Sequence, residues 1–196
     1  MTQPAPRPRD SQRARLYRAE GEVDAGRRLP TVERMQAWVD GLVATGWFVA
    51  RWGARSFEVR PGFGHRRATA DENGVLQMPK WARSELVLLH EVAHCLTPVT
   101  FAGHGPEYAG VLLTLARRGM GPGTAQLLED AFARERVRWT LAAVPDVRAG
   151  WPSVANSRQT AAWAMAPGAS VGDGPAASLS AAHQRDTVDI VGHRDV

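Results

Sequence analysis

The feature that most constrains this 196-residue chain is an apolar helical segment that carries three titratable side chains. Residues 81–96 show the three- and four-residue spacing of a helix, and Pro98 closes it by disfavouring the helical conformation just before it. His90, Glu91 and His94 lie inside this segment in the pattern H-E-x-x-H. The neighbouring positions are apolar on nearly every face: Leu86, Val87, Leu88, Leu89, Val92, Ala93, Cys95 and Leu96. A buried helix of this kind rarely carries such side chains without partners.

Two histidines four residues apart project from one face of a helix, because four residues make nearly a full turn and rise about 6 Å. His90 and His94 can each place a ring nitrogen about 2.0–2.1 Å from one zinc ion. Glu91 lies beside them, where its carboxylate can accept a proton from a water on the metal. The alternative, a surface helix with two solvated histidines, conflicts with the apolar surroundings. The pattern predicts a zinc site with Glu91 as the general base.

A catalytic zinc site takes three protein ligands and leaves one position for water, so a further ligand is expected downstream. His104 is the leading candidate, because it lies in the loop before the next expected helix. The metzincin arrangement requires Gly and His three and six residues after the second histidine, and Thr97 and Thr100 occupy those positions. A glutamate from the next helix is the other standard solution, with Glu107 preferred over Glu129.

Two elements of the sequence resemble a known family. HEVAH followed after nine residues by HGPEY resembles the SprT-like zinc metallopeptidases, which are zincins whose third ligand belongs to an H-G-x-E-F/Y element. The runs RDSQRARLYRAE, LHEVAHCLTP and AGHGPEYAGVLL resemble a family of small bacterial metallohydrolases over roughly residues 9–140. The resemblance implies His90, His94 and His104 as ligands of one zinc ion and Glu91 as the catalytic acid/base.

Further candidates lie around these ligands. Glu107 could replace His104 as a ligand, accept a ring N–H from a ligand histidine or pair with an arginine. Tyr108 is expected to pack, although its hydroxyl could donate to a developing oxyanion. Cys95 points about 100° away from His94 and is expected in the core. As the single cysteine, it excludes the zinc ribbon of SprT-like proteins that act on DNA-bound protein, which argues against DNA repair.

Periodic apolar positions elsewhere place the chain in the α+β class. The expected helix near the N-terminus carries Leu16 and Tyr17 inward, and the next begins at Thr31 and is stopped by Gly46. The additional helices are expected at 13–20, 31–45, 106–117 and 124–134.

Short aromatic and β-branched runs predict three or four antiparallel strands, in a small antiparallel or mixed sheet packed on the active-site helix. The Asn73–Gly74 pair predicts a hairpin turn, because both residues tolerate positive φ. The strand Gly74–Met78 is expected at the edge of a cleft, where an extended peptide could add to the sheet. Strands are expected at 47–53, 56–60, 66–70 and 74–78, and 137–141 could add a last one.

Composition divides the chain into three parts. Residues 1–10 are rich in Pro and Arg and are expected to be flexible, and 146–196 are an Ala/Gly/Pro/Ser-rich tail expected to be disordered. Residues 11–145 are expected to form one domain, which the resemblance implies is a zincin-like metallohydrolase domain. No run of about 18 apolar residues occurs, which argues against a membrane protein. The N-terminal residues lack the apolar stretch of a signal peptide, so a cytoplasmic location is expected.

The charge gives weak support for a nucleic-acid partner. Lys and Arg total 24 against 20 Asp and Glu, a formal net charge of +4. Arg66 and Arg67 could bind phosphates, but an ordinary solvated face is the preferred explanation, because nearly all basic residues of this chain are Arg. The expected function is that of a zinc-dependent hydrolase, a metallopeptidase acting on peptide or protein. The alternatives are a non-catalytic zinc-bearing module that binds protein or nucleic acid, and an amidohydrolase acting on a small amide.

Overall fold

The computed structural model describes residues 9–64 and 66–141, which form an α+β fold of six α-helices and a three-stranded mixed sheet. Apart from Arg9 and Asp10, the expected flexible segment 1–10 and the expected tail 146–196 lie outside the described residues. The helices are α1 (Arg13–Gly21), α2 (Val32–Val43), α3 (Gly46–Trp52), α4 (Glu85–Leu96), α5 (Pro106–Gly119) and α6 (Pro122–Arg134). The strands are β1 (Glu58–Pro61), β2 (Thr69–Ala70) and β3 (Val75–Met78), and a single 3-10 turn, η1 (Lys80–Ala82), precedes α4.

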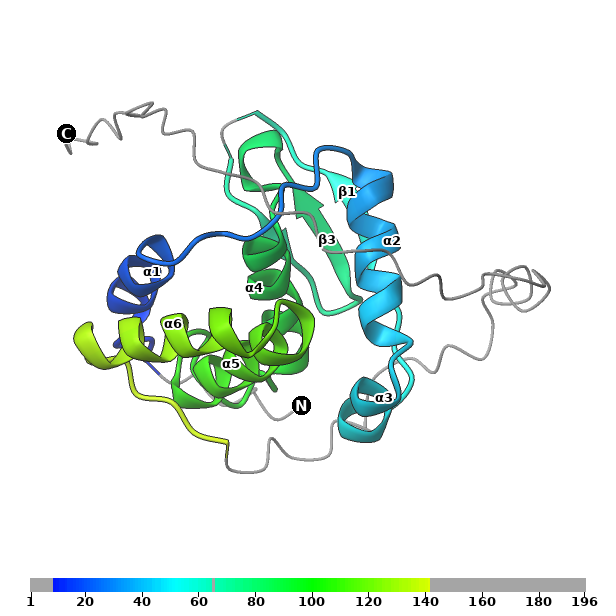
Figure 1. The fold of residues 1–196 in the computed structure, drawn as a ribbon. Helices are drawn as coiled ribbons and strands as arrows, with labels where there is room; N and C mark the ends of the chain where they lie inside the picture. Colours follow the sequence, from blue (N-terminus) through cyan, green and yellow to red (C-terminus); the bar gives the residue numbers. More distant parts are fainter. Residues whose placement is uncertain (1–8, 65, 142–196) are drawn as a thin grey trace, which may run out of the picture. The chain divides into compact units, whose positions relative to one another are not determined.

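Helix α4 lies between the sheet and a layer of helices (Figure 1). It contacts β2 and β3 on one side and α5 on the other, while α5 packs on α6 and α6 packs on α1. Nine of the 12 residues of α4 are buried, including His90 and Glu91. A helix covered on both faces requires apolar residues nearly all round, which explains its sequence.

Helix α2 caps the free side of strand β1. It begins at Thr31, whose side-chain oxygen accepts a hydrogen bond from the backbone N–H of Arg34 at 3.2 Å. The Gln36 side chain donates to the carbonyl of Phe57 and accepts from the N–H of Val59, both at 2.8 Å. These bonds satisfy backbone groups beside β1 that a further strand would otherwise use.

The strand order is β1-β3-β2, with β3 in the centre. Strand β3 is parallel to β1 and antiparallel to β2, so the sheet is mixed, which is one of the two arrangements expected. It is mixed because β2 pairs with the far side of β3 instead of with β1. Both sides of β3 are thus hydrogen-bonded, which contradicts the expectation that Gly74–Met78 forms an edge open to a peptide.

The predicted hairpin between β2 and β3 is confirmed. Gly74 adopts φ +80°, a conformation that side chains disfavour. The Asp71 side chain accepts hydrogen bonds from the N–H groups of Asn73 and Val75, each at 2.9 Å. The Asp71 N–H donates to the Val75 carbonyl at 3.1 Å and closes the turn.

Residues 47–53 were expected to form a strand, and this prediction is wrong. They belong to α3, where Phe48 and Trp52 lie one turn apart and are both buried. A run of seven mostly apolar residues fits a strand or a helix, because it is too short to distinguish the two-residue periodicity of a strand from the three- to four-residue periodicity of a helix. Gly53, at φ +76°, ends the helix.

The possible last strand at 137–141 is absent. Thr140 instead passes close to α5, where a Cβ added to Gly110 would collide with the Thr140 carbonyl. The Thr140 N–H donates to the carbonyl of Pro106 at 3.0 Å, so this segment is bonded to α5. Trp139 in this segment is 37% exposed.

The remaining helices are confirmed, with ends that differ by a few residues from the sequence expectation. Gly46 begins α3, and α2 already ends at Val43. Leu16 is buried as expected, but Tyr17 is 40% exposed and does not enter the core. Among the described residues, no helix has both the length and the apolar character needed to cross a membrane.

Candidate metal centre

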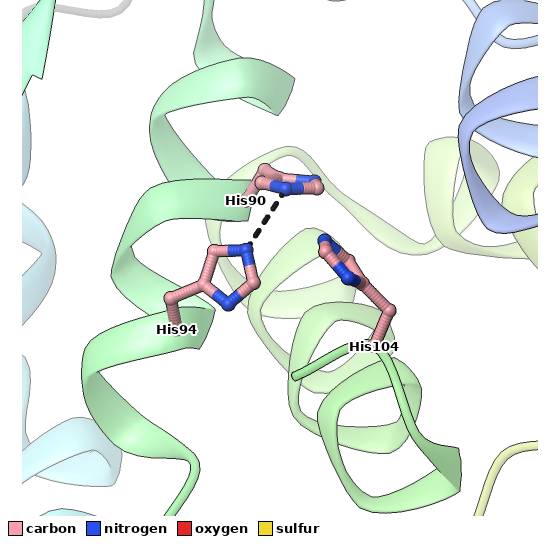
Figure 2. Close-up of side chains that lie close together, drawn as sticks. All are labelled: His90, His94 and His104. Carbon is pink, nitrogen blue, oxygen red and sulfur yellow. Dashed lines mark hydrogen bonds between the residues drawn. The ribbon is translucent and has the colours of Figure 1, made fainter. Parts of the chain in front are cut away.

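Three histidines, His90, His94 and His104, lie close together (Figure 2). His90 and His94 project from successive turns of α4, and their Nε2 atoms are 3.1 Å apart. His104 approaches from the loop between α4 and α5, and its ring centroid is 4.7 Å from that of His94. One nitrogen of each ring lies within 4.8 Å of the corresponding nitrogens of the other two. This spacing suits three ligands around one cation, so the three residues could hold a metal ion.

Two carboxylates fix the orientation of two of these rings. Glu20, on α1, accepts a hydrogen bond from Nδ1 of His90 at 2.8 Å. Asp10, just before α1, accepts one from Nδ1 of His104 at 2.7 Å. A proton on Nδ1 of a neutral imidazole leaves Nε2 as a lone pair. Carboxylates beneath ligand histidines are the usual means of fixing this tautomer and raising the basicity of the ligand.

The Nε2 atom of His104 is buried and, among the described residues, has no hydrogen-bond partner. The Nε2 atoms of His90 and His94 face each other, so one of them must carry a proton if nothing lies between them. Leaving a buried ring nitrogen without a partner costs about 1–3 kcal/mol. A cation bound by all three Nε2 atoms would satisfy them together, so the donor set fits a metal ion.

Burial keeps two of the three rings neutral, the form that binds metal. Burial, together with repulsion from His90 and His104, lowers the pKa of His94 to about 2. Burial also lowers the pKa of His104, although the hydrogen bond to Asp10 opposes this effect. For His90, burial acts in the same direction, but the carboxylate of Glu20 outweighs it and the pKa is raised.

Glu91 is 5% exposed and lies on α4 next to His90. Burial raises the pKa of this carboxyl to about 7, with His90 opposing the shift and Glu20 adding to it. Glu91 and His90 both line a cavity of about 490 Å³. A carboxyl with a pKa near neutrality beside a cavity is suited to take up and release protons.

The ring of Tyr108 packs against the rings of all three histidines. Its ring centroid lies 4.5 Å from that of His94, 5.1 Å from that of His104 and 5.3 Å from that of His90. The side chain is fully buried, and its hydroxyl donates to the backbone carbonyl of His90 at 3.2 Å. Tyr108 therefore packs in the core, which is one of the two alternatives expected, and its hydroxyl proton is already used in the hydrogen bond to the His90 carbonyl.

The two glutamates considered as ligands are not part of the three-histidine group, which was found among the described residues. Glu107 lies in the first turn of α5, and its carboxylate is close to the backbone of Gly105. Glu129, on α6, pairs with Arg117 at 3.1 Å. The carboxylates that touch the ligand rings are instead Asp10 and Glu20.

Sequence reasoning did not identify Asp10 and Glu20 as part of the site. Both lie within the run RDSQRARLYRAE, whose helix was expected, but they are 94 and 70 residues from their histidine partners. The signal that could have found them is a general one: a histidine that binds a metal usually donates its other ring N–H to a carboxylate, a carbonyl or water. The rule does not say which of the 20 acidic residues of the chain would serve.

Comparison with known proteins adds no assignment: no protein-family model, no curated protein and no solved structure matches this chain. The resemblance to SprT-like zinc metallopeptidases remains a prediction from two short motifs. The chemistry of the site is therefore argued from its own geometry.

Proposed function

We propose that this protein is a zinc-dependent hydrolase with a zincin-like domain, and that it cleaves peptide bonds with Glu91 as the general base. The observation that carries the proposal is the convergence of three imidazole Nε2 atoms beside a buried carboxyl on the same helix. The resemblance of HEVAH and HGPEY to SprT-like zinc metallopeptidases supports the same ligands and the same base.

Three nitrogen ligands favour a catalytic site over a structural one, because structural zinc sites use four protein ligands. An ion bound there would leave a position for water, would lower the pKa of that water to about 7 and would polarise a carbonyl oxygen. His90, His94 and His104 would hold the ion. Glu20 and Asp10 keep His90 and His104 in the required tautomer.

Glu91 would carry the proton through the reaction. In the metal-free protein, burial raises the pKa of this carboxyl to about 7, so both its charged and its neutral form are accessible near neutral pH. The carboxylate accepts a proton from the attacking water as the C–O bond forms. The resulting carboxylic acid then donates that proton to the amide nitrogen as the C–N bond breaks. One side chain thus serves as base and then as acid.

The test is the variant Glu91→Gln, with Glu107→Gln as the matched control outside the histidine cluster. We expect Glu91→Gln to retain one zinc per chain and to lose at least about a hundredfold in the rate of peptide cleavage. The control should keep both properties. Metal analysis and mass spectrometry of a digested peptide library measure the two quantities. Cleavage retained by Glu91→Gln would remove Glu91 from the mechanism, and a zinc-loaded parent without any cleavage would refute the proposed function.

A further inference from the structure

The cavity beside His90 and Glu91 has the size and lining of a site for a small organic group. Its volume, about 490 Å³, lies within the range of about 300–1,000 Å³ typical of ligand sites. Helix α1 and the chain after it form one wall, and α4 forms the opposite wall. Half of the lining residues have apolar side chains: Val23, Ala25, Ala68, Trp81, Leu86 and Val87. An apolar or aromatic side chain entering this space would be removed from water.

Tyr17 links this cavity to the histidine cluster. It lines the cavity, is 40% exposed, and stacks on the ring of His90 with centroids 5.5 Å apart and an interplanar angle of 20°. Its ring also meets that of His104 edge-on at 5.1 Å. A group in the cavity would therefore lie against an aromatic face that continues directly onto a metal-binding ring.

Two arginines add positive charge around Tyr17. Arg67 lines the cavity, and the guanidinium of Arg13 lies 6.0 Å from the centroid of the Tyr17 ring. Both are exposed, and in the part of the chain that the structure describes neither pairs with a carboxylate. Of the two acidic side chains of the cavity, Glu20 is bonded to His90 and Glu91 is buried on α4. The cavity thus combines apolar side chains with the guanidinium of Arg67, and a second guanidinium, that of Arg13, lies beside its Tyr17 ring.

We propose that this cavity receives an apolar, preferably aromatic, side chain of a substrate that also carries a carboxylate, which pairs with Arg67 and Arg13. This inference rests on the proposed function and names its substrate class: an amide or short peptide with an aromatic residue and an adjacent carboxylate. The carboxylate belongs either to the chain terminus of the substrate or to an acidic neighbouring residue. Guanidinium groups recognise both in the same way.

The test measures binding, so that it does not depend on turnover. The full-length, zinc-loaded protein is titrated in a calorimeter with N-acetylphenylalanine, with its neutral amide, and with N-acetylglycine, which lacks the ring. A fourth compound, N-acetylphenylalanyl-aspartyl amide, places the carboxylate on an acidic neighbour. Removing the ring should weaken binding at least about tenfold, because burial of an aromatic side chain is lost. Converting the acid to the amide should weaken it about fivefold, the upper range for an exposed ion pair.

Two variants assign the binding to the cavity. Gly21 lines it, and a Cβ added there meets no atom within 4 Å, so Gly21→Phe should fill the space without disturbing α1. Gly41→Phe is the matched control, since an added Cβ there also meets no atom within 4 Å but Gly41 does not line the cavity. Arg67→Gln is compared with Arg51→Gln, an exposed arginine on α3. We expect Gly21→Phe to weaken binding at least about tenfold and Arg67→Gln about fivefold, with both controls unchanged.

Equal affinity for the compounds with and without the ring, or unchanged binding by Gly21→Phe, would overturn the assignment of the cavity. Equal affinity for the acid and the amide, or unchanged binding by Arg67→Gln, would overturn the claim that a substrate carboxylate pairs with the arginines. Tighter binding of either carboxylate compound supports the proposal, and the better of the two identifies the source of the charge. Binding as expected without peptide cleavage would refute only the proposed function and would leave this inference standing. Peptide cleavage without these binding preferences would refute this inference and would leave the proposed function standing.

Discussion

Removal of the Glu20 carboxylate should weaken metal binding although Glu20 is not itself a ligand. The side chain comes from α1, accepts a hydrogen bond from Nδ1 of His90 at 2.8 Å, and is only 14% exposed. In Glu20→Gln the amide oxygen can still accept that hydrogen bond, but the negative charge is lost. In Glu20→Ala the bond is lost as well, and the buried ring of His90 is free to rotate or to adopt the other tautomer.

The expected magnitude follows from the two losses. Hydrogen bonds to a charged group are about twice as strong as neutral ones, so the amide retains roughly half of the interaction. Substitutions of such carboxylates typically reduce metal affinity about 10–100-fold. We therefore expect Glu20→Gln to weaken zinc binding about tenfold and Glu20→Ala about a hundredfold. These factors correspond to about 1.4 and 2.7 kcal/mol.

The assay is a competition titration in which a chromophoric chelator and the protein share a limiting amount of zinc. Glu22→Gln is the control, because Glu22 is two residues away and pairs with Arg134 at 2.7 Å instead of with a histidine. It should leave zinc affinity unchanged, and denaturant unfolding of the metal-free proteins checks that each variant folds. Equal zinc affinities for Glu20→Gln, Glu20→Ala and Glu22→Gln would refute the reasoning.

Three further predictions concern the metal-free protein. Glu91→Gln removes a carboxyl whose pKa rises from 4.5 in the unfolded chain to about 7 in the folded chain. Ionisation of this carboxyl is therefore harder in the folded state, and the parent protein loses unfolding free energy as pH rises from about 4.5 to about 7. Denaturant unfolding should find the variant about 3 kcal/mol more stable at pH 8 and less than about 1 kcal/mol more stable at pH 5; equal stability at pH 8 would contradict this. Burial raises the pKa of the Cys95 thiol to about 12, so iodoacetamide should modify folded protein at pH 8 at least about a hundredfold more slowly than unfolded protein, and equal rates would rule the burial out. Gly110→Ala, whose Cβ would collide with the Thr140 carbonyl, should cost about 1–3 kcal/mol of unfolding free energy, whereas Gly41→Ala should cost nothing.

The histidines were accessible to sequence reasoning because helix geometry fixes the relation between them. Positions 90 and 94 must share a face of any helix that contains them, and the apolar residues around them indicate burial. His104 required only the additional argument that a loop returns to the helix. The structure does bring these three rings together.

The sheet was predicted less well, because its strands are short. A strand of two residues such as β2 (Thr69–Ala70) carries no periodicity, and strand order depends on contacts between distant segments. The run from Trp47 to Trp52 fits a helix and a strand equally, and packing of its aromatic side chains selects the helix. Asp10 and Glu20 were missed for the same reason, since only the folded chain brings α1 to the histidines.

The central claim is that three imidazoles bind one divalent ion, and X-ray absorption spectroscopy at the zinc edge tests it most directly. Protein loaded with one equivalent of zinc should give a first shell of nitrogen or oxygen at about 2.0–2.1 Å, with the multiple-scattering signal of three imidazoles and no sulfur. His104→Ala should lose one of those imidazoles. A zinc–sulfur distance of about 2.3 Å, fewer than three imidazoles in the parent protein, or failure to retain zinc would contradict the account.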